Sequence, residues 1–274
     1  MLCVGIIQLN TGNQIRAATD IAESFIREAA AKGAQFITTP ETSHLMEMDR
    51  EAVLTKACCE QDDEGLKRFR ALAQELGVWL HIGSLIIKVS DVKLANRGFM
   101  IDPDGEVKAR YDKLHLFDVD LPNGEVYRES KLYEPGENAV LVHSPWGKIG
   151  LTICYDVRFP HLYRTLAEEG AAIIMVPAAF TVKTGEAHWH TLLKARAIET
   201  GCFVLAAAQT GKHATGRSTY GHSLAVDPWG TVVADGGTQP GLTLVDLDLA
   251  KVAETRLTMP SLKHKRPYGV NQFE

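Results

Sequence analysis

The chain has 274 residues, of which 45% are hydrophobic and 23% charged, and its formal net charge is -5 at pH 7. This composition is ordinary for a globular protein, and the length fits one large α/β domain or two smaller ones. The acidic balance argues against a nucleic-acid partner, because proteins that bind nucleic acid usually carry a strong basic excess. The longest apolar stretch, residues 171–180, is too short to span a bilayer and contains a proline. We therefore expect a soluble protein with no membrane partner.

The N-terminal segment and the cysteines bear on the compartment. The segment MLCVGIIQLN carries no basic residue and becomes polar at Gln8, so it predicts a first strand rather than a signal peptide. The five cysteines are Cys3, Cys58, Cys59, Cys154 and Cys202. Their odd number and the lack of any C-x-x-C motif favour a reduced protein, so we expect a cytoplasmic location.

Strand and helix patterns alternate in the first part of the chain. Residues 3–10 predict a strand, and apolar residues then recur at helical spacing from residue 15 until Gly33. Residues 34–40 predict the next strand, which leads into Glu41. A helix is predicted over 64–76, with a strand at 78–87 behind it. This alternation is typical of α/β proteins.

The middle of the chain changes character. Residues 96–102 and 106–113 flank a Pro-Asp-Gly turn and predict a β-hairpin. Residues 119–138 show no sustained periodicity, so we predict a long polar loop there. Loops of this length inside a compact domain are usually functional or disordered.

Alternation returns in the second half of the chain. The predicted elements are strands at 149–154 and 171–177, helices at 160–169 and 187–200, and strands at 202–209, 222–227, 231–234 and 242–249. Several of these strands lack strict alternation, which indicates that both of their faces are covered. We therefore expect one domain in which two packed sheets are coated by helices.

Three polar residues follow three predicted strands, namely Glu41, Lys113 and Cys154. Open α/β sheets place their sites beyond the carboxyl ends of the strands. Each residue alone is weak evidence, because strand-end Glu and Lys are usually on the surface and most free cysteines are small buried hydrophobes. Together they form a chemical set. A carboxylate can activate a thiol, and an ammonium with the backbone N–H of Tyr155 can stabilise an oxyanion.

The motifs TTPETS, YDKLHLFD and GLTICYDVRFP resemble, in this order, those of the nitrilase (carbon–nitrogen hydrolase) superfamily. The resemblance covers the chain and implies a single domain over 1–274 with an α/β fold, a four-layer α-β-β-α sandwich of two packed mixed sheets. By matching positions it implies that Glu41 is the general base, Lys113 the oxyanion donor and Cys154 the nucleophile.

The family often uses a second glutamate after the lysine, and the resemblance implies that Glu129 fills this role. Glu134 and Glu125 are the alternatives. His161 departs from the family pattern, because relatives commonly carry an acidic residue there. A second carboxylate near a lysine would hold the ammonium in place and orient the substrate amide or the water.

The resemblance implies hydrolysis of a linear, non-peptide amide C–N bond through a cysteine thioester, without a cofactor. Residues 188–213 and 218–234 are similar to the deaminated glutathione amidases, which release 2-oxoglutarate and cysteinylglycine. An ω-amidase acting on 2-oxoglutaramate and another aliphatic amidase or nitrilase remain alternatives. An inactive interaction protein of the same fold is a further alternative, but such a chain would be expected to lack a member of the Glu–Lys–Cys triad.

Six side chains are expected to bind the substrate, namely Tyr155, Arg158, Phe180, His188, Lys212 and Arg217. The last two lie in the glycine-punctuated segment 211–222, which we predict to be a flexible loop. A basic side chain there can hold the distal carboxylate of a long substrate, and arginine can do so with two parallel hydrogen bonds.

Other site types fit the sequence less well. Neither a Cys–His protease signature nor a nucleophile elbow surrounds Cys154. His188 and His190 are two residues apart, whereas a zinc-binding helix carries histidines at i and i+4 with an intervening Glu. We therefore expect no metal site. The helix over 187–200 is apolar around more of its circumference than one core requires, which favours a homodimer or larger assembly.

Overall fold

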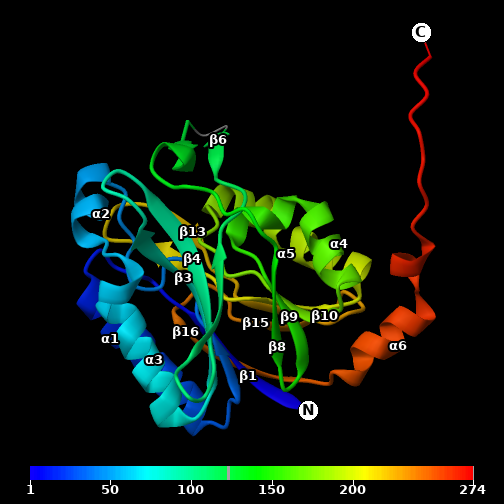
Figure 1. Ribbon diagram of the computed structural model, residues 1–274, viewed down its shortest axis with the longest axis horizontal. Coiled ribbons are helices and arrows are strands. Elements are labelled where there is room, and N and C mark those ends of the chain that lie inside the picture. The colour runs from blue at the N-terminus through cyan, green and yellow to red at the C-terminus, as the bar shows by residue number, and fades with distance from the viewer. Residues whose placement is uncertain (122–123, 274) are drawn as a thin grey trace.

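Two six-stranded sheets form the inner layers of the computed structural model, which describes residues 1–121 and 124–273 (Figure 1). The first sheet consists, in order, of β16 (Gly241–Leu247), β1 (Leu2–Gln8), β2 (Phe36–Thr38), β3 (Trp79–Lys88), β4 (Leu94–Ile101) and β5 (Val107–Asp112). The second consists, in order, of β15 (Val232–Asp235), β14 (Leu224–Val226), β11 (Phe203–Ala206), β10 (Ala171–Met175), β9 (Gly147–Leu151) and β8 (Val140–Ser144).

Both sheets are mixed and share one plan. Strands β1, β2 and β3 are parallel, as are β9, β10 and β11, and the outer strands of each sheet pair in the antiparallel sense. Because β4 is antiparallel to both β3 and β5, β5 runs in the same direction as β2. The chain therefore leaves β2 and β5 at the same edge of the sheet, which brings Glu41 and Lys113 to one end of the sandwich.

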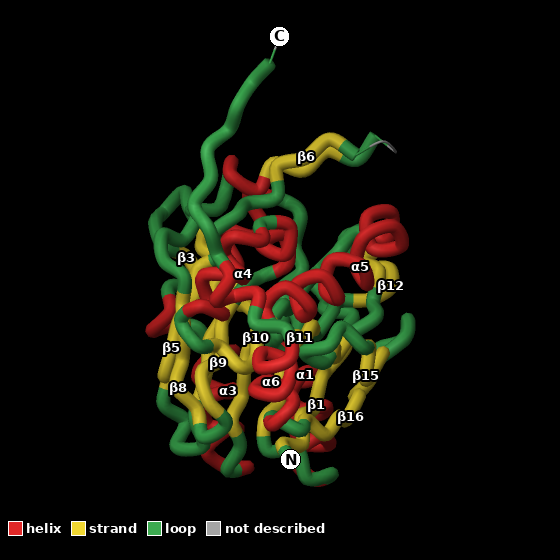
Figure 2. Tube along the Cα trace, turned by 90° about the vertical axis from the view of Figure 1, so that its right-hand side faces the viewer, coloured by secondary structure: helices red, strands yellow, loops and turns green. Residues whose placement is uncertain are grey.

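Helices form the two outer layers, as Figures 1 and 2 show. Helices α1 (Ile15–Ala31) and α3 (Glu64–Leu76) cover the first sheet, and α4 (Pro160–Glu168) and α5 (Val182–Thr200) cover the second. In β1, Val4 and Ile6 pack toward the second sheet, whereas Ile7 packs in the separate cluster beneath α1 and α3. Burial on both faces explains the weak alternation of the strands, and the predicted four-layer α-β-β-α sandwich is confirmed.

The remaining elements lie at the margins of the sandwich. They are α2 (Arg50–Lys56), α6 (Ala250–Thr258), and the 3-10 helices η1 (Glu60–Asp62), η2 (Glu129–Lys131), η3 (Cys154–Arg158) and η4 (Ser261–His264). Beyond η4 the chain runs away from the sandwich as an exposed strap that reaches the C-terminal end in Figure 1. Within the described part of the chain, none of the helices combines the length and the apolar character needed to cross a membrane.

The helix predicted over 64–76 is confirmed as α3, because its termini carry strong local signals. Asp63 caps the first turn by accepting a hydrogen bond from the backbone N–H of Leu66, and Gly77 ends the helix in the left-handed conformation with a φ of 63°. Helix α5 instead begins five residues before the predicted 187, at Val182. Thr181 is its N-cap and accepts from the N–H of Thr184, while Gly185 in the first turn weakens the helical pattern.

Three other predicted segments differ from the structure. The strand predicted over 149–154 ends at Leu151, so Cys154 begins a 3-10 turn rather than ending a strand. The predicted loop 119–138 contains part of the hairpin β6 (Asp118–Asp120) and β7 (Val126–Arg128), together with η2; its residues 122–123 lie outside the described residues. The predicted loop 211–222 is a second hairpin, β12 (Thr210–Lys212) and β13 (Ser218–Tyr220). Paired strands of three residues are too short to show a period.

Candidate active site

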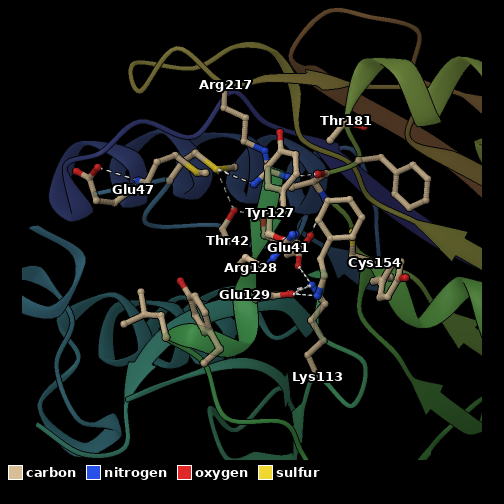
Figure 3. Close-up of a pocket in the computed structure, with 18 of the residues that line it drawn as sticks. Glu41, Thr42, Glu47, Lys113, Tyr127, Arg128, Glu129, Cys154, Thr181 and Arg217 are labelled. Atoms are coloured by element: carbon tan, nitrogen blue, oxygen red, sulfur yellow. Dashed lines mark hydrogen bonds and ion pairs between the residues drawn. The ribbon is translucent and has the colours of Figure 1, made fainter. Parts of the chain in front are cut away.

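A pocket of about 300 Å³ lies where the ends of the two sheets meet. The loop after β2 supplies Glu41 and the end of β5 leads into Lys113, while η2 supplies Glu129 and η3 supplies Cys154. In Figure 3 the two glutamates converge on the ammonium of Lys113. The structure thus brings into one pocket the four side chains that the sequence marks as catalytic.

Glu41 is buried and held from three sides. Its Oε1 accepts hydrogen bonds from Lys113 Nζ at 3.0 Å and Asn96 Nδ2 at 2.8 Å, and its Oε2 accepts from the backbone N–H of Ala179 at 2.8 Å. Burial pushes the pKa of Glu41 upward, but the Lys113 charge and the hydrogen bond with the Cys154 thiol outweigh it and hold the pKa below its ordinary value. Glu41 is therefore an ionised carboxylate positioned beside the thiol.

Lys113 lies between two carboxylates. Its Nζ is 3.0 Å from Glu41 Oε1 and 2.9 Å from Glu129 Oε2. Burial acts to lower the pKa of Lys113, but the negative charges of Glu129 and Glu41 raise it well above its ordinary value. The side chain is therefore a fixed ammonium, which can donate hydrogen bonds but cannot accept a proton.

Glu129 holds Lys113 from the other side of the pocket. Its Oε2 also accepts a hydrogen bond from the backbone N–H of Phe117 at 2.6 Å, and its Oε1 accepts from Asn96 Nδ2 at 3.3 Å. Of the three candidates for the second carboxylate, Glu129 lines the pocket, whereas Glu134 and Glu125 are outside the set of described lining residues. The geometry thus favours Glu129 among the alternatives.

Cys154 has a strained backbone at the start of η3. Its φ of 49° lies in the left-handed region, which costs a residue with a side chain about 1 to 3 kcal/mol. The turn is held by a hydrogen bond from Cys154 N–H to Pro177 O at 2.9 Å. The buried Asp156 carboxylate accepts from Ile153 N–H at 2.8 Å and from the Tyr111 hydroxyl at 2.6 Å. These contacts fix the direction in which the thiol faces the pocket.

The thiol of Cys154 is protonated in the resting site. Burial raises its pKa, the negative charge of Glu41 raises it further, and the opposing effect of Lys113 is smaller. A preformed thiolate is thus disfavoured. A thiol of this kind attacks an electrophile only as its proton moves to a base, and Glu41 is the carboxylate hydrogen-bonded to it.

The six expected substrate-binding residues separate into two groups. Tyr155, Phe180 and Arg217 line the pocket. Arg158, His188 and Lys212 are outside its lining, as far as the described residues define it.

Arg158 and His188 contact each other at the rim, where the Arg158 guanidinium nitrogens lie 3.3 Å from His188 Nδ1. The Arg158 guanidinium also lies 5.3 Å from the centre of the Phe180 ring, which faces the pocket. Lys212 is exposed on β12, and its hairpin partner is Ser218. Of Lys212 and Arg217 in this hairpin, only Arg217 therefore lines the pocket, as far as the described residues define it.

Arg217 reaches the pocket from the β12–β13 hairpin, and Figure 3 places it beside Tyr127. Its Nη2 donates to Ala179 O at 2.5 Å, and its guanidinium carbon lies 5.5 Å from the centre of the Tyr127 ring. Its Nε is buried and, within residues 1–121 and 124–273, has no hydrogen-bond partner. An arginine that lines a pocket wall is suited to bind an anionic group through its guanidinium.

Three supporting residues escaped the sequence analysis. Asn96 in β4 donates to both glutamates, and buried Gln209 donates to the backbone oxygen of Glu41 at 2.9 Å. Gly83 allows β3 to approach the Glu41 loop, because a Cβ there would lie 2.2 Å from Thr39 O. A polar residue within an apolar strand was the available signal for Asn96. The roles of the other two depend on contacts between distant segments.

Comparisons with known proteins show a family, relatives and solved structures to which the chain is similar. The family described as carbon-nitrogen hydrolase matches residues 3–257. The chain is 40% identical over 269 residues to the deaminated glutathione amidase of Yersinia enterocolitica. The matched region covers 96% of this chain and 92% of that relative.

Two solved structures extend the comparison. The Caenorhabditis elegans NitFhit protein matches with a TM-score of 0.91 at 36% identity over 97% of this chain, which spans 65% of that longer chain. The amidase from Nesterenkonia sp. AN1, in a structure showing Michael addition of acrylamide at its active-site cysteine, matches with a TM-score of 0.80 at 26% identity. That match covers 95% of this chain and 98% of the amidase.

Proposed function

The chain belongs to the carbon–nitrogen hydrolase family, and on this premise we propose that it hydrolyses an amide through a thioester on Cys154. The observation that carries the proposal is the contact set in the pocket. A buried thiol is hydrogen-bonded to the ionised Glu41, which in turn contacts the ammonium of Lys113. This set contains a nucleophile, a base and a cationic donor within one pocket.

In the acylation step, Glu41 takes the proton from Cys154 as Sγ bonds to the carbonyl carbon of the amide. The carbonyl oxygen becomes an oxyanion, which is stabilised by the ammonium of Lys113 and the backbone N–H of Tyr155. The C–N bond then breaks, and Glu41 returns the proton to the leaving nitrogen. The products of this step are a free amine and a thioester on Cys154.

In the deacylation step, a water molecule replaces the amine. Glu41 takes a proton from the water as its oxygen attacks the thioester carbon, and the same donors stabilise the second oxyanion. The C–S bond breaks, and the proton returns to Sγ. Glu129 holds Lys113 in position throughout, since it contacts the ammonium with both carboxylate oxygens.

We assign deaminated glutathione as the substrate, with 2-oxoglutarate and cysteinylglycine as the products. The support is the relative from Yersinia enterocolitica, which is named for this activity and matches over nearly its whole length. The pocket chemistry is compatible, because the substrate carries carboxylates at both ends and the cationic Arg217 lines the pocket wall. We place the cysteinylglycine carboxylate at Arg217.

A competition assay tests both the reaction and the substrate. Deaminated glutathione and 2-oxoglutaramate are supplied together at equal low concentration, and the two products are followed over time. We expect deaminated glutathione to be consumed faster, in proportion to kcat/KM. Faster consumption of 2-oxoglutaramate would identify an ω-amidase instead.

Absence of both activities would leave two explanations, another aliphatic amidase or nitrilase and the inactive interaction protein. Iodoacetamide separates an active site from an inactive one, because a bound amide slows alkylation of Cys154 and leaves the other thiols unaffected. The Cys154→Ala variant is the matched control in both measurements. Alkylation of Cys154 at the same rate with and without either amide would contradict the proposed mechanism.

The proposal includes a homodimer in the cytoplasm. Ile198 on α5 and Trp229 beside it are 55% and 59% exposed, and neighbouring exposed apolar side chains are a feature of protein–protein contact sites. The two segments adjoin, since a Cβ on Gly230 would lie 2.5 Å from Ile198 Cγ1. A second copy packed on the α4–α5 layer would cover both side chains. The five free cysteines fit a reducing compartment.

A further inference from the structure

His190, His222 and Asp235 converge on the surface of the molecule, away from the pocket. His190 lies on α5, Asp235 ends β15, and His222 lies in the segment between β13 and β14. One ligand atom from each lies within 4.8 Å of the other two. None of the three is among the described residues that line the catalytic pocket.

The separations fit the edges of a metal coordination shell. His190 Nε2 lies 3.2 Å from Asp235 Oδ2, and His222 Nδ1 lies 3.0 Å from Asp235 Oδ1. Two ligands of a tetrahedral Zn²⁺ ion lie about 3.3 Å apart when each metal–ligand bond is about 2.0 Å. The side chains are 23% to 36% exposed, so water can complete the shell.

The three residues are held in place by their neighbours. The backbone N–H of Gly237 donates to Asp235 Oδ1 at 2.8 Å, which orients the carboxylate. The His222 ring stacks on Tyr220 with centroids 4.6 Å apart, and its backbone oxygen accepts from Trp189 Nε1 at 2.8 Å. His222 also has a φ of 54°, a left-handed conformation that only a fixed environment maintains. Ligands that are already oriented lose little entropy when a metal binds.

We propose that His190, His222 and Asp235 form a binding site for a divalent transition-metal ion, with Zn²⁺ as the best match. Two imidazoles and one carboxylate suit Zn²⁺, Co²⁺ and their neighbours, whereas Mg²⁺ and Ca²⁺ prefer oxygen ligands. The ion would join α5 to β15 and to the segment that follows the β12–β13 hairpin. Its effect is structural, because it is separate from the groups that act on the amide.

The two-residue spacing of His188 and His190 predicts no metal site for these two histidines as a pair. In the structure they diverge, since His188 contacts Arg158 and His190 contacts Asp235. The additional ligands come from segments more than thirty residues further along the chain. Such a site leaves no spacing motif.

The test uses the full chain with the Cys154→Ala substitution, which removes the active-site thiol as a competing ligand. After chelator treatment, Zn²⁺ binding is measured by competition with a chromophoric indicator of micromolar affinity, and Co²⁺ binding by visible absorption. We expect one equivalent of metal, a Co²⁺ spectrum without thiolate charge transfer, and a rise in Tm with added Zn²⁺. Mg²⁺ should produce no rise.

Two ligand variants and one matched control identify the site. His190→Gln and His222→Asn should each weaken Zn²⁺ binding by at least about tenfold, the scale on which metal sites respond to altered ligand support. His188→Gln, on the same helix, should leave it unchanged. Asn is chosen at position 222 because it tolerates the left-handed backbone there. Circular dichroism checks that each variant folds. If His222→Asn does not fold, His190→Gln alone decides the test. Failure to compete with the indicator, or equal affinity in His190→Gln and its parent, would overturn the proposal.

Discussion

The ammonium of Lys113 lies 3.0 Å from Glu41 Oε1 with both side chains at least 95% buried. Removing one member of a buried ion pair leaves the other charge uncompensated, which is costly. Without Glu41, the ammonium of Lys113 still contacts the carboxylate of Glu129. Without Lys113, Glu41 loses the cationic group to which it is hydrogen-bonded. The two sides of the pair should therefore respond differently to substitution.

Lys113→Ala should lower kcat by at least about a hundredfold, because the oxyanion loses its cationic donor. It should also destabilise the fold by about 3 kcal/mol, since two buried carboxylates are left facing each other. Rates and Tm measured on the same preparations test both effects. Glu41→Gln, which removes one of those carboxylates, should lose activity on a similar scale with a smaller fall in Tm. An active Lys113→Ala enzyme would contradict the assigned role.

Cys154→Ala should abolish turnover and leave Tm nearly unchanged, because alanine meets the same backbone strain and loses little packing. Cys154→Ser should also be nearly inactive, since Glu41 is positioned for a thiol and an alcohol is far less acidic. Initial rates with deaminated glutathione provide the measurement. A rate above about a tenth of the parent rate in either variant would exclude the thioester route. A tenfold loss corresponds to only about 1.4 kcal/mol in activation free energy, which is too little for loss of the nucleophile.

Glu129→Gln should lower kcat more than it changes KM, because the residue positions Lys113 rather than the substrate. Glu134→Gln is the matched control, since Glu134 is an exposed glutamate five residues further along the chain. Steady-state rates of the two variants decide whether Glu129 or Glu134 is the second carboxylate of the site. An inactive Glu134→Gln beside an unaffected Glu129→Gln would move the second carboxylate to Glu134.

Alkylation and turnover should depend differently on pH. The raised pKa of Cys154 means that the thiolate fraction, and with it the rate of iodoacetamide alkylation, increases about tenfold per pH unit from about pH 7 to about pH 9. Turnover should stay nearly level over this range, because Glu41 is ionised throughout and takes the proton during attack. An alkylation rate that levels off near pH 7 would reveal a preformed thiolate.

The layered fold was predictable because its signals are local. Capped helices such as α3 and apolar strands such as β1 carry their pattern within a few residues. Lys113 directly follows a strand, and Glu41 and Cys154 each lie three residues beyond the end of one. The hairpin β12–β13 was not predictable, because three-residue strands gain their stability from pairing. The same limit applies to Asn96 and to the His190–Asp235 contact, which exist only because distant segments meet.

Substrate choice should depend on Arg217 and not on Lys212, although the two residues are five positions apart. Arg217 lines the pocket, whereas Lys212 is exposed on the partner strand of the hairpin. Arg217→Ala should therefore raise KM for deaminated glutathione by about tenfold or more, as expected for one lost charged hydrogen bond. Because 2-oxoglutaramate lacks the distal carboxylate, its KM should change little, and Lys212→Ala should affect neither substrate. Steady-state kinetics of both variants on both amides make the comparison. Equal losses on the two amides in Arg217→Ala would mean that Arg217 supports the Glu41 loop through Ala179 instead of binding the carboxylate.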